Sequence, residues 1–279
     1  MSTPISFEFF PPRGDDAWPA FVATATELAA LKPEYVSVTF GAGGSLQGGT
    51  LEAVSRLRAS LNLDTAPHIS CVGTTPESIR DLLRAYQEQG VRRLVVLRGD
   101  LPSGAGLGAG PFRYARDLVA FIRAETGAHF HIEVAAYPEM HPQARTPDAD
   151  LGHFIDKVDA GADAAITQYF FSAAAYVDFV ERVRDRGCTV AITPGIMPIT
   201  NHRQLTRFSG ICGAEIPRWI RLRLEQYGED LASIRAFGED VVTHLCEQLL
   251  AQGAPGLHFY TLNRTEPTRA LCARLKLTA

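Results

Sequence analysis

A carboxylate among aromatic side chains marks the start of the sequence. The run SFEFFPP sets Glu8 among Phe7, Phe9 and Phe10 before two prolines end it. Removing a carboxylate from water is costly unless the group is paired or protonated. In an extended strand, Phe7 and Phe9 share one side, and Ser6, Glu8 and Phe10 share the other. Glu8 therefore either faces water or is placed for acid–base chemistry.

Polar residues also interrupt other apolar runs of the chain. They include Thr39, His68, Ser70, Glu133 and Gln168. Strands of a parallel barrel are buried on both faces and are normally continuous apolar runs. Several polar residues fall near the ends of five such runs, where barrel enzymes carry their active sites: Glu8, Thr39, Arg98, Tyr137 and Gln168. The alternative is that some of them only satisfy one another in a core network.

Eight short β-branched or aromatic runs would position these side chains. They are ISFEFF (5–10), YVSVTF (35–40), APHISCV (66–72), RLVVLRG (93–99), HIEVAAY (131–137), AAITQYF (164–170), TVAITPGI (189–196) and LHFYTL (257–262). Amphipathic segments such as 17–32, 75–90 and 172–187 lie between them and predict helices. Thr75 and Ser172 are the expected caps of the second and third of these helices.

This alternation predicts an α/β protein, a (β/α)8 TIM barrel, because no linker or change of composition divides the chain. We therefore expect one catalytic barrel domain over residues 1–279. About sixty residues, from 195 to 255, separate the seventh and eighth strands. Helix signals at 202–210, 215–228 and 229–253 predict extra helices there, as a lid or substrate wall.

Composition narrows the class of protein. The 279 residues include 27 basic and 31 acidic side chains, a net charge of −4, with no basic block. This balance argues against nucleic acid or an anionic membrane as a partner. The sequence has neither a signal-peptide pattern nor a run of about 18 uncharged apolar residues. We expect a cytoplasmic protein whose five scattered cysteines are reduced thiols.

Other catalytic motifs are weak or missing. The glycines of LRGDLPSGAGLGAG (97–110) imitate a dinucleotide fingerprint, but they do not directly follow the strand, so a surface loop is the simpler interpretation. GAGGS (41–45) is either a phosphate cradle or a turn. No HExxH or GxSxG occurs, and His129 and His131 lie at the start of their strand. We expect no metal site, and a metal-dependent barrel hydrolase stays an alternative.

Eight blocks of sequence, in order, carry a family resemblance. They are SFEFFPPR, KPEYVSVTFGAGG, APHISCVGTTPE, LRGDLP, AAYPEMHP, KVDAGADAAITQYFF, ITPGIMPITN and HFYTLNR. Together they resemble bacterial, single-domain 5,10-methylenetetrahydrofolate reductases over essentially the whole chain. The resemblance implies a (β/α)8 barrel that holds FAD. It also implies a ping-pong reaction in which NAD(P)H reduces the flavin, which then reduces methylenetetrahydrofolate to 5-methyltetrahydrofolate.

The resemblance also implies roles for single residues. Glu8 would be the general acid that protonates the leaving nitrogen when the folate ring opens, kept protonated by its aromatic surroundings. Asp100 would lie beside the flavin and the pterin. Gln168 would contact both substrates. Phe208, with Gln204 beside it, would stack on whichever substrate is bound, although from the residues alone Phe208 is more simply a core residue of the extra helices.

The FAD contacts implied by the resemblance come from the same motifs. They are Thr39, His68, Arg98, Gly99, Asp100, Tyr114, Ala115, Tyr137, His141, Asp150 and Lys157. Arg98, His141 and Lys157 suit the diphosphate. We expect a homo-oligomer without the adenosylmethionine-binding domain of eukaryotic relatives. A proline-dehydrogenase-like flavin barrel and a folate-sensing scaffold are alternatives, and the preference between NADH and NADPH stays open.

Overall fold

Parallel strands form one continuous sheet in the computed structural model, which describes residues 3–40, 47–99 and 110–277. The strand order is β7-β6-β5-β4-β3-β2-β1-β9-β8, and the neighbouring strands of the described residues pair in parallel. The strands are β1 (Ile5–Phe9), β2 (Tyr35–Val38), β3 (Thr65–Ser70), β4 (Arg93–Leu97), β5 (His131–Ala136), β6 (Ala164–Thr167), β7 (Ala191–Thr193), β8 (Gly195–Ile196) and β9 (Leu257–Tyr260). All eight predicted strand runs are confirmed.

The predicted seventh strand closes the barrel as two short pieces. β7 pairs with β6, and β8 pairs with β9, so the two ends of the sheet order are joined through Pro194. Proline has no N–H for the ladder, which is why the strand is interrupted there. A Cβ on Gly195 would come within 2.2 Å of the Thr167 carbonyl oxygen, so only glycine permits this close approach.

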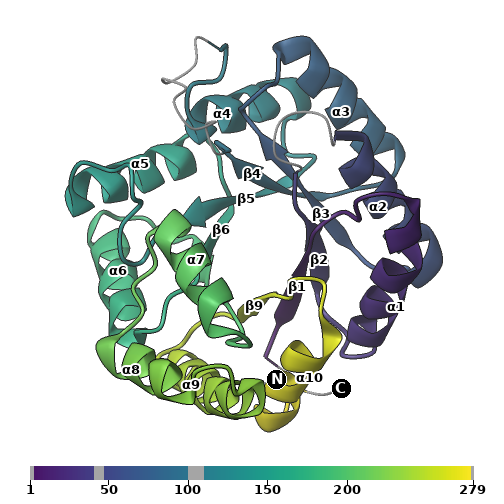
Figure 1. Ribbon diagram of the computed structural model, residues 1–279. Helices are drawn as coiled ribbons and strands as arrows, with labels where there is room; N and C mark the ends of the chain where they lie inside the picture. The colour runs from purple at the N-terminus through teal and green to yellow at the C-terminus, as the bar shows by residue number, and fades with distance from the viewer. Residues whose placement is uncertain (1–2, 41–46, 100–109, 278–279) are drawn as a thin grey trace.

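Helices surround the sheet as an outer ring (Figure 1). Their bounds are η1 (Asp15–Ala17), α1 (Trp18–Ala29), α2 (Gln47–Leu61), α3 (Pro76–Glu88), α4 (Ala115–Thr126), α5 (Pro147–Asp159), α6 (Ala173–Asp185), α7 (His202–Cys212), α8 (Arg218–Tyr227), α9 (Leu231–Ala251) and α10 (Thr265–Arg274). Thr75 caps α3 as predicted, with Ser78 completing a capping box. Ser172 precedes α6, but its side chain makes no capping hydrogen bond.

The predicted helices of the seventh loop are α7, α8 and α9. In Figure 1, α9 continues the outer ring between α8 and α10, whereas α7 is drawn inside the ring. The hydroxyl of Tyr169, just beyond β6, lies 3.0 Å from the hydroxyl of Ser209 on α7. α7 is therefore held against the end of β6.

The two faces of β1 point in opposite directions, one toward the surrounding helices and one into the barrel. Phe7 and Phe9 are fully buried, and the Phe9 ring lies 5.8 Å from that of Phe21 on α1, so this face of β1 packs against the helices. Ser6 and Glu8, on the opposite face, point into the barrel. Within the described ranges, no helix is long and apolar enough to cross a membrane.

Candidate active site at the barrel mouth

Glu8 lies inside the barrel, near the end where the strands finish. Its side chain is 13% exposed, and its Oε2 atom lies 3.4 Å from Nε2 of His68 and 3.7 Å from Nε2 of His258. Neither imidazole nitrogen has a hydrogen-bond partner among the described residues. Two buried rings from β3 and β9 thus face one carboxyl group from β1.

The residues around the Glu8 carboxyl group are not the phenylalanines that adjoin it in the sequence. Phe7 and Phe9 point away from it, because successive strand residues alternate in direction. His68 and His258 approach its carboxyl group instead. Burial lowers the pKa of His68 to about 4, opposed in part by the charge of Glu8 and reinforced by His258. His68 is therefore neutral at physiological pH, and the expected aromatic enclosure of Glu8 by its phenylalanine neighbours is wrong.

Sequence analysis missed His258 and Tyr260. Both belong to the predicted run LHFYTL, and their even spacing places them on one face of β9. The parallel register pairs Ser6 with His258 and Glu8 with Tyr260. Burial, and then the charge of Glu8, raise the pKa of the Tyr260 phenol well above its ordinary value. The alternation of polar and apolar residues in LHFYTL was the signal that could have identified them.

Arg98 and Gly99 follow β4, as predicted, while Asp100 and the glycine-rich segments 41–45 and 102–109 lie outside the described residues. Arg98 donates a 2.6 Å hydrogen bond to Oε1 of Gln143, on the segment after β5. Gly99 has a φ of +85°, and a Cβ there would lie 2.1 Å from Oγ of Ser70. The turn after β4 therefore requires glycine at this position.

A second group of predicted residues meets at β5 and α5. The Tyr137 and His141 rings are 4.6 Å apart, and Oδ2 of Asp150 accepts a 2.8 Å hydrogen bond from the His141 N–H. Lys157 donates a 2.5 Å hydrogen bond to the carbonyl oxygen of Ala135. Burial lowers the pKa of Lys157 to about 8, and the charge of Asp150 opposes this shift.

Two predicted residues at the start of α4 have neighbours on the outer helices. Tyr114 precedes the helix, and Ala115 is its first residue. The Tyr114 ring stacks on exposed His153 of α5 at 6.2 Å, and the Arg116 guanidinium lies 5.4 Å from its centroid. Thr39 lies at the end of β2 and donates its N–H to the carbonyl of Phe9 at 2.9 Å.

A small hollow brings Gln168 to the end of α7. It encloses about 170 Å³ and is lined by Tyr137, Pro138, Glu139, Met140, Gln168, Tyr169, Cys212, Gly213 and Ala214. The Oε1 atom of Gln168 accepts from the N–H of Tyr169 at 3.0 Å. The N–H of Gln204 donates to the capping Oδ1 of Asn201. Phe208 is half-buried against the main core, the simpler of its two expected environments.

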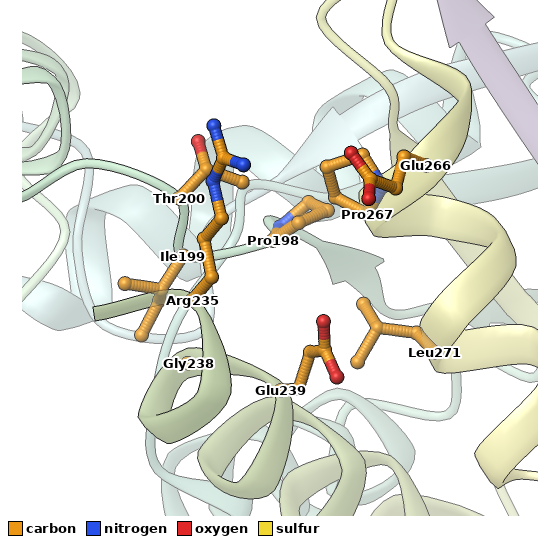
Figure 2. A pocket seen from close by; sticks show the side chains of 9 residues that line it. All are labelled: Pro198, Ile199, Thr200, Arg235, Gly238, Glu239, Glu266, Pro267 and Leu271. Carbon is orange, nitrogen blue, oxygen red and sulfur yellow. The ribbon is translucent and has the colours of Figure 1, made fainter. Parts of the chain in front are cut away.

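A larger hollow lies between α9, α10 and the segment after β8. It encloses about 350 Å³, including open solvent, and Figure 2 shows Glu239 and Leu271 extending into it from the two helices. None of the predicted site residues that the structure describes lines it. Elsewhere in the described ranges, no three His, Cys, Asp or Glu side chains are placed to hold a metal ion.

A protein family and several named relatives match this sequence. The sequence model of the family described as methylenetetrahydrofolate reductase matches residues 1–276. The 5,10-methylenetetrahydrofolate reductases of Escherichia coli (strain K12) and Salmonella typhimurium are 38% and 39% identical over 271 residues, which is 97% of this chain and 90% of each relative. A rice protein named as a probable methylenetetrahydrofolate reductase (NADH) is 37% identical over 99% of this chain and 48% of its own length.

The fold has a counterpart among solved structures. A Clostridium thermocellum protein, described as binding two copies of 5-methyl-5,6,7,8-tetrahydrofolic acid, has a TM-score of 0.67 with 17% identity. The alignment covers 99% of this chain and 94% of that one. At this identity the likeness supports the barrel fold alone. The family match and the bacterial relatives show that this chain belongs to the methylenetetrahydrofolate reductase family of oxidoreductases.

Proposed function

We propose that this chain is an FAD-dependent enzyme that reduces 5,10-methylenetetrahydrofolate to 5-methyltetrahydrofolate. NAD(P)H would supply the reducing equivalents, and the two substrates would use one site in turn, as a ping-pong reaction requires. We also propose that residues 1–279 act as a single catalytic barrel domain that assembles into a homo-oligomer. Membership of the family supports the overall reaction, and the arrangement of side chains at the mouth supports the more detailed roles below.

The carboxyl group of Glu8 carries the proposal. The folate carbon to be reduced bridges two nitrogens in a five-membered ring, and opening that ring requires a proton on the leaving nitrogen. Glu8 is a nearly buried acid at the end of the barrel where the strands finish. It faces two histidines and, among the described residues, forms no ion pair with a lysine or arginine. A general acid needs this partial shelter together with access to the mouth.

The described residues suit FAD. Arg98 and His141 lie on the segments after β4 and β5, and Lys157 lies on α5. Donor groups of these types bind a diphosphate well. Lys157 provides the more specific observation. Burial of an ammonium group is costly without an anion nearby, and here the cost lowers the Lys157 pKa to about 8. A bound diphosphate would add negative charge beside Lys157 and stabilise its charged form.

Bound FAD would supply a carrier for the hydride between nicotinamide and folate. Asp100, on the LRGD motif, would disfavour negative charge on the reduced ring and accept hydrogen bonds from the pterin amino edge. Gln168 can donate and accept through its amide, which suits alternating contact with two substrates. Phe208 and Gln204 on α7 would close over the occupied site, with Phe208 stacking on a bound ring.

The absorbance spectrum of the purified protein tests this function. We expect a flavin spectrum that is bleached by NADH without oxygen and returns when methylenetetrahydrofolate is added. Proline in place of NADH should leave the spectrum unchanged, because the proposed site takes nicotinamide and folate. A colourless protein that does not bind added FAD would refute the cofactor, and bleaching by proline would favour the proline-dehydrogenase-like alternative.

A further inference from the structure

A chain of buried polar groups runs through the barrel toward Glu8 from the end where the strands begin. At that end, Arg93 Nη1 donates to Glu133 Oε1 at 2.6 Å, and the Tyr35 hydroxyl donates to Glu133 Oε2 at 2.6 Å. Glu133 and Tyr35 are both about 4% exposed. A carboxylate paired with a guanidinium accepts hydrogen bonds and donates none, so Glu133 fixes one end of the chain.

Each hydroxyl group has only one proton to donate, so the direction of one hydrogen bond determines the direction of the next. The Tyr35 proton is committed to Glu133, so in the side-chain interaction with Ser6, its partner in the strand register, the Tyr35 oxygen is the acceptor. A hydrogen bond from Ser6 lowers the Tyr35 pKa, as a donor to the phenol oxygen does, although burial and Glu133 raise it overall. Ser6 has then used its own proton. Its Oγ must accept at its 2.7 Å contact with Nδ1 of His258.

This chain determines which nitrogen of His258 carries the proton. Nδ1 is the donor to Ser6, so in the neutral ring Nε2 has a free lone pair. That Nε2 atom is buried, lacks a partner within the described part of the chain, and lies 3.7 Å from Oε2 of Glu8. Only the protonated form of Glu8 has a hydrogen to donate to this lone pair. A small rotation of the carboxyl group would close the remaining gap.

We propose that Glu133, Tyr35 and Ser6 fix His258 as the Nδ1–H tautomer, so that its Nε2 atom serves as the hydrogen-bond acceptor for the acid form of Glu8. These four residues are positioning residues, because none of them is required to touch the substrate. The tautomer is inferred from the interactions of Ser6 with Tyr35 and His258, whereas its effect on folate reduction rests on the proposed function.

The other groups around Glu8 are compatible with this arrangement. The Tyr260 hydroxyl donates to the carbonyl of Thr167 at 2.6 Å, so its proton is not directed at Glu8. His68 is neutral near pH 7, with Nε2 at 3.4 Å from the same Oε2 atom. In its Nε2–H form, His68 can donate to a lone pair of that oxygen while Glu8 donates to His258. One carboxylic acid can satisfy both contacts.

Nitrogen NMR of the protein, labelled with 15N-histidine and bound to its flavin, tests the tautomer directly. Long-range proton–nitrogen spectra distinguish protonated from unprotonated ring nitrogens, and the signal lost in His258→Gln assigns this ring among the eight histidines. We expect Nδ1 to be protonated and Nε2 unprotonated at pH 7. A protonated Nε2 would overturn the proposal. This result does not depend on whether the protein reduces folate.

Variants test the chain at a distance from the site. Tyr35→Phe releases the Ser6 proton to point at Nδ1 and should switch His258 to the Nε2–H tautomer. Folate reduction should then fall about tenfold or more, since general acids contribute about 10²–10⁴-fold, while NADH oxidation by a quinone stays unchanged. Tyr86→Phe is the matched control, because the buried Tyr86 hydroxyl has no partner in the described residues and lies outside the chain.

Ser6→Ala gives an independent test if Tyr35→Phe folds poorly. It removes the acceptor of the His258 proton, so a mixture of both tautomers should replace the single one. If both Tyr35→Phe and Ser6→Ala keep the Nδ1–H tautomer and full folate reduction, the proposal is overturned. A switched tautomer with unchanged folate reduction would keep the chain and refute its catalytic role, and an inactive wild-type protein with the expected tautomer would refute the proposed function alone.

Discussion

The Oε2 atom of Glu8 on β1 lies 3.4 Å from Nε2 of His68 on β3, although β2 separates the two strands in the sheet. Such an approach is possible because the sheet curves into a barrel, and interior side chains of non-adjacent strands meet across it. Burial keeps His68 neutral near pH 7, so Glu8 faces an uncharged imidazole and not a cation. The chemistry of the mouth follows from this pairing.

Glu8→Gln tests the proposed general acid. The amide has nearly the same shape but cannot protonate the leaving nitrogen, so folate reduction should fall by about 10²–10⁴-fold or be lost. Oxidation of NADH by a quinone acceptor should stay near normal, because that half of the reaction does not need the proton. Separate kinetic assays of the two half-reactions measure both effects. Equal loss in both assays would contradict the assignment of Glu8.

Asp100→Asn tests the acidic residue of the LRGD motif. Removing a negative charge near the flavin makes the anionic reduced ring easier to form, so we expect a higher midpoint potential and weaker folate binding. Potentiometric titration of the flavin and folate binding to the reduced protein provide the two measurements. An unchanged midpoint potential would argue that Asp100 does not lie beside the flavin ring.

Lys157→Met tests the proposed diphosphate contact. Hydrogen bonds to charged groups contribute about 1.5–3 kcal/mol, so FAD affinity should fall about tenfold to a hundredfold. In the wild-type protein, affinity should decrease as pH rises through about 8, where Lys157 loses its charge. Fluorescence titration of the flavin-free protein across this range measures both effects. Lys32→Met, at an exposed lysine, is the control, and a similar loss in that variant would contradict the role of Lys157.

The pKa of His68 predicts a loss of stability in acid. The pKa is about 4 in the folded chain against an ordinary value of 6.5, so between these values the unfolded state binds more protons. The free energy of unfolding should therefore fall as pH decreases from about 6.5 to 4, by on the order of 3 kcal/mol from this group. Urea unfolding of wild type and His68→Asn measures the difference. Identical pH slopes in the two proteins would exclude His68 as the cause.

Gly99→Ala tests the turn that follows β4. Alanine is strained at a φ of +85°, and its Cβ would overlap Oγ of Ser70 at 2.1 Å. Strained backbone positions cost about 1–3 kcal/mol, and the overlap should add to this cost. Gly127→Ala is the matched control, with a φ of +57° and open space around it. Thermal unfolding should show a larger loss for Gly99→Ala, which Ser70→Gly should partly reverse. Equal losses would exclude the overlap.

Local sequence patterns were sufficient to predict the strands. All eight runs form strands because β-branched and aromatic residues suit a buried sheet, and Thr75 caps α3 because its hydroxyl accepts a nearby N–H. The interruption at Pro194 follows from its missing N–H. The surroundings of Glu8 were predicted wrongly, because residues adjacent in a strand point to opposite sides. Its actual neighbours are His68 and His258, sixty and 250 positions away along the chain.

The sequence by itself determined the alternation of strands and helices, the placing of Glu8 opposite Phe7 and Phe9, and the motifs of the family. These are properties of period, composition and order along the chain. Only the tertiary structure decided that His68 and His258 face Glu8, that Lys157 lies against Ala135, and that the Tyr35 hydroxyl reaches Glu133. Those contacts depend on the curvature and register of the closed barrel, which bring distant strands within a few ångströms.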